Sequence, residues 1–157
     1  MTMTRAVRQL EATGLFLVSK DGVNKVIESK CGRLELFEKS RQYLSTPVRK
    51  TGYIKKSEIT EDMVVAGETA LAEKSMLNPS RIIIYAIREK SFDKKLLMDE
   101  LIDPEKQIRL ELWAYDPRLF SKGNVADSLS VALSLSKNGD ERVEEAVEEL
   151  TERELQE

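Results

Sequence analysis

Residues 1–31 decide the organisation of the chain, and they read MTMTRAVRQLEATG followed by LFLVSKDGVNKVIESKC. Apolar residues of the first half recur at the spacing of one helix face: Met3, Val7 and Leu10. Thr2 and Thr4 are residue types that cap the start of a helix, and Gly14 is the type that ends one. The first half therefore predicts an amphipathic helix that stops at Gly14.

The second half of this stretch predicts a β-hairpin. Residues 15–19 and 23–29 are strand-like and flank Asp21 and Gly22, a strong short-range hairpin signal. A polar-faced helix, a glycine and a basic ribbon follow one another in the back half of a winged helix, where the helix enters the major groove of DNA and the hairpin lies along the backbone. An amphipathic helix followed by a hairpin also occurs in α+β domains that bind no DNA.

The residue types on this helix and ribbon suit DNA recognition. Arg5 and Arg8 are suited to bidentate hydrogen bonds with guanine edges, and Gln9 to the same contact with adenine. Lys20 and Lys25, near the hairpin tip, are suited to neutralising phosphates. The candidate DNA-binding residues are Thr2, Thr4, Arg5, Arg8, Gln9, Lys20, Asn24 and Lys25. A surface arginine pair is also common on ordinary solvated helices.

Residues 4–15, TRAVRQLEATGL, resemble the recognition helix of winged-helix transcription regulators of the MarR type, and the ribbon after them resembles the wing. The resemblance implies a transcription regulator that binds double-stranded DNA, with a homodimer as its expected state. In that family two helices precede the recognition helix. We therefore expect this sequence to begin at or just before the recognition helix, with the start of the winged helix missing.

Other segments resemble antitoxin-like proteins of the abortive-infection type IV class, in which a short winged helix precedes a larger C-terminal domain. The segments are STPVRKT at 45–51, AGETALA at 66–72, YDPRLF at 115–120 and ADSLSVALSLS at 126–136. This resemblance implies an alternative function, an antitoxin that binds a neighbouring toxin through its C-terminal lobe and regulates its own promoter.

Composition excludes several function classes. Cys31 is the sole cysteine and the chain has no histidine, so an internal disulfide, a histidine-based triad and a histidine-ligated or four-cysteine metal site are all ruled out within it. No apolar run approaches the roughly 20 residues that span a bilayer, and no signal peptide opens the chain. These features favour a cytoplasmic protein without a cofactor.

The charge is unevenly distributed along the chain. Residues 1–58 carry twelve lysines and arginines against six acids, whereas the whole chain has a net charge of −3. The remainder is therefore strongly acidic. A basic front on an acidic body favours a polyanionic partner at one end, although uneven charge is common in proteins.

The rest of the chain predicts an α/β lobe with helices packed on a short mixed sheet. Strands are expected at 48–55, 81–88 and 108–115, and helices at 33–44, 61–77 and 91–101, from Asp127, and after Asn138. The fold class is therefore α+β, a partial winged helix followed by a small α/β lobe. The expected domains are residues 1–31, the half winged helix; 32–47, a connecting helix; and 48–157, a partner or sensor domain.

Three alternatives stay open on the sequence. The helix at 33–44 packs on its twin in a dimer or bridges to the second lobe. The basic strand at 48–55 contacts DNA or an acidic toxin, or carries its lysines only to protect a sheet edge. Trp113 and Tyr115, on the outer side of a half-buried strand, pack under a helix or form a partner surface.

We expect no enzyme. There is no glycine-rich phosphate loop and no Gly-x-Ser-x-Gly motif. Asp116 follows a strand and Glu111 lies within it, but they are five residues apart, which places them on opposite faces of an extended strand. Cys31 is expected to be a small core residue, since no histidine is present to activate it.

Overall fold

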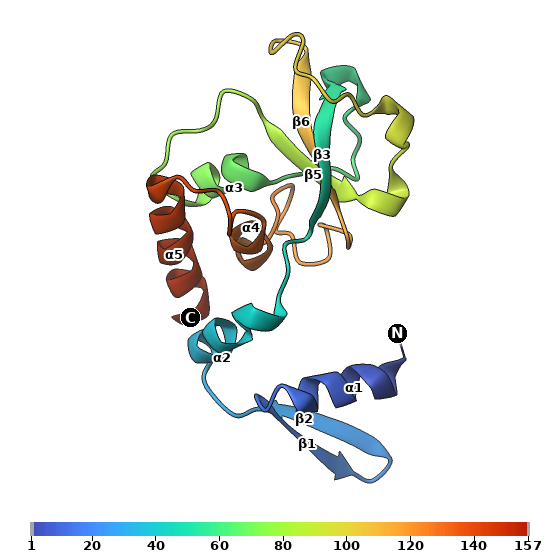
Figure 1. The fold of residues 1–157 in the computed structure, drawn as a ribbon, viewed down its shortest axis with the longest axis vertical. Helices are drawn as coiled ribbons and strands as arrows, with labels where there is room; N and C mark the ends of the chain where they lie inside the picture. Colours follow the sequence, from blue (N-terminus) through green and yellow to red (C-terminus); the bar gives the residue numbers. More distant parts are fainter. Residues whose placement is uncertain (1, 157) are drawn as a thin grey trace. The chain divides into compact units, whose positions relative to one another are not determined.

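The computed structural model describes residues 2–156, and the chain forms two compact units. One contains the residues up to Leu44 together with those from Leu155 on, and the other contains Ser45–Glu154. The fold is mixed α+β, with a separate small sheet in each unit (Figure 1). The expected connecting segment at 32–47 is divided between the units, and the outer bounds of the expected domains, Met1 and Glu157, lie outside the described residues.

The first unit begins with the expected helix and hairpin. Its elements are α1 (Met3–Ala12), β1 (Phe16–Asp21), β2 (Asn24–Ser29) and α2 (Arg33–Ser40). Thr2 caps α1, since its hydroxyl accepts a hydrogen bond from the Arg5 backbone N–H at 3.3 Å. Gly14, with φ at 74°, ends the helix turn in the left-handed region. Helix α2 is shorter than expected, because a 3₁₀ turn over Arg41–Tyr43 replaces its last turn.

The hairpin turn lies one residue later than the sequence suggested. Asp21 pairs with Asn24 across the strands, so Asp21 belongs to β1 and the loop is Gly22 and Val23. Gly22 has φ at 61°, and a glycine at the first loop position suits the two-residue turns that match strand twist. Val23 is therefore a turn residue and not the first residue of the second strand.

The second unit is built on a mixed sheet between residues 48 and 113, with its strands in the order β3-β6-β5-β4 (Figure 1). These are β3 (Val48–Lys55), β6 (Gln107–Trp113), β5 (Ile84–Arg88) and β4 (Val64–Val65). Strand β6 runs antiparallel to β3 and parallel to β5, and β4 is antiparallel to β5. The expectation of a short mixed sheet is confirmed.

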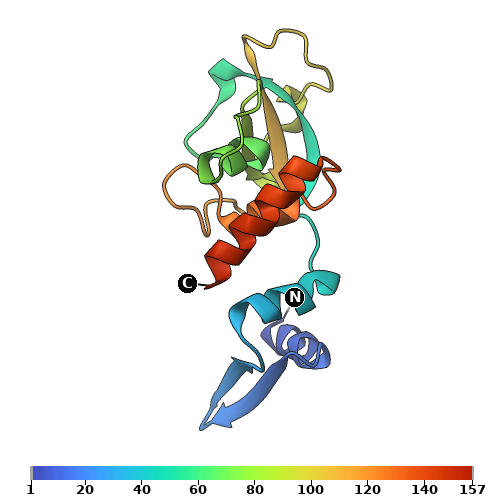
Figure 2. The ribbon, with the colours of Figure 1, turned by 90° about the vertical axis from the view of Figure 1, so that its left-hand side faces the viewer.

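Helices cover one face of this sheet, as the two views in Figures 1 and 2 show. They are α3 (Gly67–Lys74), α4 (Ser128–Ser134) and α5 (Glu141–Gln156). Trp113 is fully buried beneath them, in a core that also contains Leu71, Val131 and Val147. The strand at 108–115 was expected to be half-buried, which is wrong, because its Trp113 side lies under helices. The alternative that Trp113 packs is confirmed.

The opposite face of the sheet is covered mainly by loop segments. Ile54, Ile108, Leu110 and Leu112 form its core, and Leu97 packs against them. The segment around residue 98 crosses β3 closely because Gly52 has no side chain. A Cβ there would lie 2.5 Å from Leu97 Cγ.

The expected helix at 61–77 is confirmed only over Gly67–Lys74, and the expected helix at 91–101 is wrong. Within 61–77, Val64 and Val65 form β4 and the helix starts only at Gly67, whose φ is 54°. Over 91–101 there are two 3₁₀ turns, Glu89–Ser91 and Lys94–Leu96, and then extended chain. Tertiary pairing prevails over helical periodicity in both segments: β4 joins β5, and Met98 exchanges two backbone hydrogen bonds of 2.8 Å with Tyr53.

Candidate nucleic-acid interface

Helix α1 presents the expected polar face to solvent. Val7 is its buried residue, and Arg5, Arg8 and Gln9 are exposed. With about 100° of rotation per residue, Arg5 and Gln9 lie nearly opposite Val7, and Arg8 lies beside Arg5. Neither arginine takes part in an ion pair within residues 2–156. This face therefore carries two unneutralised guanidinium groups and one amide.

The two threonines of the candidate set occupy different places. Thr2 is the N-cap, and its hydroxyl oxygen is bound to the Arg5 N–H while its O–H remains a donor. Thr4 is exposed but stands three residues before Val7, on the flank that borders the buried side. Thr2 therefore lies at the start of α1, and Thr4 lies on a different side of the helix from Gln9.

The hairpin brings Lys20 and Lys25 together. They are direct cross-strand partners, so both side chains project from the same face near the tip. Asn24 pairs with Asp21 on the other face, so the structure separates Asn24 from the two lysines. Like charges in directly opposite positions destabilise a hairpin, and no carboxylate among the described residues forms an ion pair with either lysine. A polyanion bound at the tip would offset this repulsion.

Sequence reasoning missed one residue at this tip. Val23 occupies the second loop position and is fully exposed. An exposed apolar side chain there, next to the pair of Lys20 and Lys25, is available to a binding partner. The sequence alone could not assign Val23 to the turn, because a two-residue turn at Asp21 and Gly22 fits the same stretch.

The basic strand β3 lies at the edge of the second unit's sheet. This position is the one that the edge-protection alternative requires. Arg49 and Lys50 are exposed on it. Part of its outer edge is occupied by Met98, which pairs with Tyr53. Edge protection by charged side chains accounts for these residues without a ligand.

The two carboxylates weighed as catalytic groups have structural partners. Glu111 is buried and accepts a hydrogen bond of 3.0 Å from the Trp113 indole N–H, and burial raises the pKa of its carboxyl. Asp116 is held by two hydrogen bonds from the Arg118 side chain, which lower the pKa of Asp116. Cys31 is half-buried and lies in a turn where the Ser29 hydroxyl donates to its carbonyl.

Neither a metal site nor a membrane helix is seen in the described part of the chain. Residues 2–156 contain no group of three histidine, cysteine, aspartate or glutamate side chains placed to hold a metal ion. Over the same residues, every helix is too short or too polar to cross a bilayer. The chemistry that the first unit offers is therefore cationic and hydrogen-bonding, on a helix and a hairpin next to each other in the sequence.

Comparison with protein-family models, with curated proteins and with solved structures found no match to this chain. The case for nucleic-acid binding accordingly depends on the side chains of α1 and the hairpin.

Proposed function

We propose that the protein is a transcription regulator that binds double-stranded DNA through α1 and the β1–β2 hairpin. The observation that carries this proposal is the pair Lys20 and Lys25, which face each other at the hairpin tip and form no ion pair with any carboxylate of residues 2–156. If only the stability of the hairpin mattered, an acidic residue opposite one of the lysines would be more favourable. The arrangement therefore favours an external polyanion as partner.

The division of labour follows from the chemistry of each element. The exposed face of α1 meets base edges in the major groove, which is about 12 Å wide and admits one helix. Arg5 and Arg8 read guanine, Gln9 reads adenine, and the Thr2 hydroxyl donates to a phosphate at the helix start. The hairpin follows the backbone, with Lys20 and Lys25 on phosphates and Asn24 on its other face.

A dimer and a cytoplasmic location are part of the same proposal. The first unit exposes large apolar side chains, among them Met3 and Leu17, and buries few. Units of this size are usually marginal alone, so covering these side chains by a second copy would stabilise the unit. A cytoplasmic location follows from the proposed function, because a transcription regulator must reach the DNA that it binds.

The test is the binding of full-length protein to DNA from upstream of its own gene, compared with unrelated DNA of equal length. Arg5→Ala combined with Arg8→Ala should abolish the preference for the upstream DNA. Arg81→Ala with Arg142→Ala removes the same charge from exposed positions of the second unit and should leave the preference intact. Unchanged preference in the first variant would overturn the assignment of Arg5 and Arg8.

A second candidate function is an antitoxin whose second unit binds a toxin encoded next to it. Leu119 and Phe120 favour this function, because these large apolar residues are 64% and 67% exposed on a loop that ion pairs anchor. Arg118 ties that loop to Asp116 and to Asp62 through its guanidinium group. Exposed apolar side chains on a fixed loop are suited to a protein partner.

Co-expression with the product of the adjacent gene, followed by gel filtration, tests this candidate. Leu119→Ser combined with Phe120→Ser should prevent co-elution if the loop is the contact. Failure of the wild-type protein to co-elute counts against the antitoxin role and leaves the DNA proposal to its own test.

A further inference from the structure

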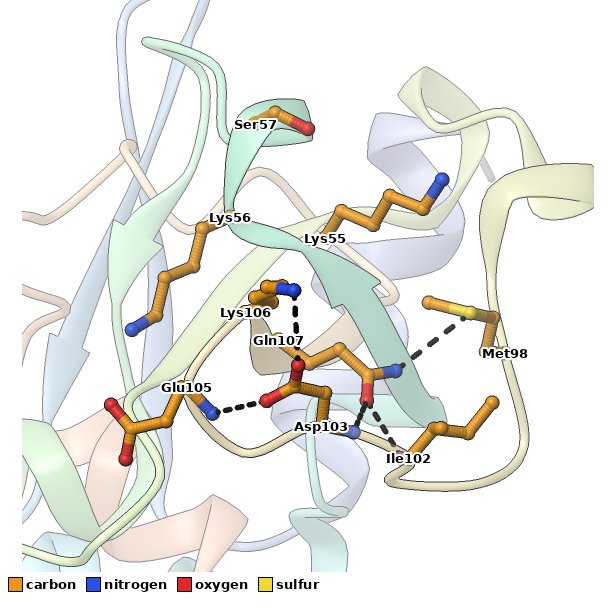
Figure 3. A pocket seen from close by; sticks show the side chains of 9 residues that line it. All are labelled: Lys55, Lys56, Ser57, Met98, Ile102, Asp103, Glu105, Lys106 and Gln107. Carbon is orange, nitrogen blue, oxygen red and sulfur yellow. Dashed lines mark hydrogen bonds and ion pairs between the residues drawn. The ribbon is translucent and has the colours of Figure 1, made fainter.

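A cavity of about 480 Å³ lies in the second unit, between the end of β3 and the loop that leads into β6. Figure 3 shows the side chains around it, with Met98 and Ile102 on one side and Lys56 and Glu105 on the other. Its volume lies within the range of pockets that hold small molecules, about 300–1,000 Å³. All of its residues belong to one unit, so the cavity is a property of that unit alone.

The wall of the cavity is held in place by Gln107, which is almost fully buried. Its side-chain oxygen accepts hydrogen bonds of 2.7 Å from the backbone N–H groups of Ile102 and Asp103. Its amide nitrogen donates to the Glu100 carbonyl at 3.4 Å and contacts the Met98 sulfur at 3.7 Å (Figure 3). The amide is fully used in shaping the loop, so the cavity exists before any ligand arrives and Gln107 itself is not a ligand contact.

The apolar part of the cavity is left open to water. Ile102 stands at its mouth and is 77% exposed, although isoleucine is among the residues most often buried. Met98 lies beside it, on the segment fixed to β3 by the Tyr53 backbone. An apolar group inserted here would remove the Ile102 side chain from water.

The charge around the cavity is unbalanced in favour of cations. The carboxylate of Asp103 is already used, by the Glu105 N–H at 3.0 Å and by Lys106 at 3.5 Å. Lys55 and Lys56 have no ion pair within residues 2–156. They extend to opposite sides of the cavity (Figure 3). Three lysines thus line the cavity against the carboxylates of Asp103 and Glu105, and Glu105 lies on the Lys56 side (Figure 3). A ligand with one negative charge would find its free ammonium group on the Lys55 side.

We propose that this cavity binds a small amphipathic anion, a short apolar chain or ring that carries one carboxylate. The apolar part lies against Ile102 and Met98, and the carboxylate meets Lys55, on the side away from Glu105. The site is separate from the DNA-binding proposal, since every residue in it belongs to the second unit.

Isothermal titration calorimetry of the full-length protein with octanoate tests the proposal, with octylammonium as the matched cation. Octanoate should bind and octylammonium should not, because only the anion complements the lysines. Ile102→Glu should weaken octanoate binding by at least about tenfold, since it places a like charge at the mouth. Leu119→Glu adds the same charge at another exposed apolar residue of the unit and should leave the affinity unchanged.

Trp113 fluorescence shows whether each variant remains folded, because this indole lies in the core of the same unit. The proposal is overturned if octanoate shows no binding stronger than about 10 mM. It is also overturned if octylammonium binds as well as octanoate, or if folded Ile102→Glu retains the wild-type affinity.

Discussion

Glu111 is a buried carboxylic acid on the central strand of the second unit, and its environment favours the protonated form. Burial raises the pKa of its carboxyl, while the hydrogen bond from Trp113 and the charge of Arg109 oppose the rise. Gly67 passes close by, because a Cβ at that glycine would lie 3.2 Å from one Glu111 carboxylate oxygen. The acid therefore has little water and a single hydrogen-bond donor.

Glu111→Gln should raise the free energy of unfolding at neutral pH. A group whose pKa is raised in the folded state contributes most below the unfolded value, and its contribution falls as pH rises through the folded pKa. The variant should therefore equal the wild type below the ordinary pKa of glutamate and be increasingly more stable as pH rises towards the raised pKa of Glu111. Urea unfolding followed by Trp113 fluorescence measures the difference, with exposed Glu148→Gln as the control. A difference that stays constant with pH would show that folding does not raise the pKa of Glu111.

Gly52→Ala should destabilise the second unit by about 1–3 kcal/mol, the usual cost of overpacking. The new Cβ would lie 2.5 Å from Leu97 Cγ and 2.8 Å from the Met98 carbonyl oxygen, so the 97–98 segment must move away from β3. The same unfolding measurement applies, with Lys50→Ala as an exposed control in the same strand. Wild-type stability in the alanine variant would mean that this segment is loosely held.

The candidate DNA-binding residues were predictable on α1 and less so on the hairpin. A helix of known period places Arg5 and Gln9 opposite Val7 without further information. In a hairpin the face of each side chain depends on the register, and one residue of slip reverses every face. The turn at Gly22 and Val23 could not be distinguished from one a residue earlier, so the separation of Asn24 from the lysines emerged only from the structure.

At the scale of elements, local sequence signals predicted the elements correctly where no long-range strand pairing competes with them. They failed where the backbone pairs with a distant part of the chain. The ends of β3 and the cap of α4 at Asp127 follow from short stretches of sequence, and both are confirmed. The segment around Met98 has apolar residues at helical spacing, yet its backbone pairs with Tyr53, about 45 positions earlier along the chain. Only the three-dimensional structure reveals this pairing.

The hairpin tip should show opposite effects on stability and on DNA binding. Lys25→Glu would place a carboxylate opposite Lys20, which should stabilise the hairpin by about 0.2–1 kcal/mol. The same change should weaken DNA binding, because a phosphate contact becomes a repulsion.

Lys25→Gln isolates the phosphate contact. It should lower the slope of log affinity against log salt concentration by about one, the loss of a single neutralised phosphate. Lys30→Gln, exposed outside the tip, should leave the slope unchanged. An unaltered slope in Lys25→Gln would remove the hairpin tip from the proposed interface.

At the scale of the whole molecule, the two units should unfold separately. The buried apolar residues of the first unit include Val7 and Phe37, whereas those of the second form two extended clusters around its sheet. Circular dichroism, which senses both units, should therefore show a loss of helix at lower urea than the change in Trp113 fluorescence. Coincident transitions would show that the units form a single cooperative structure.

The central claim is that the arginines of α1 contact guanine directly. The decisive measurement is a double-mutant cycle on the stretch of upstream DNA that the protein binds, in which each guanine is replaced in turn by 7-deazaguanine, which lacks the N7 acceptor. For at least one guanine, the replacement should cost the wild-type protein about 1–3 kcal/mol and cost the Arg5→Ala or Arg8→Ala variant almost nothing. If the free-energy losses of the base replacement and the arginine substitution are additive at every guanine, neither arginine contacts a guanine N7 and the account is contradicted.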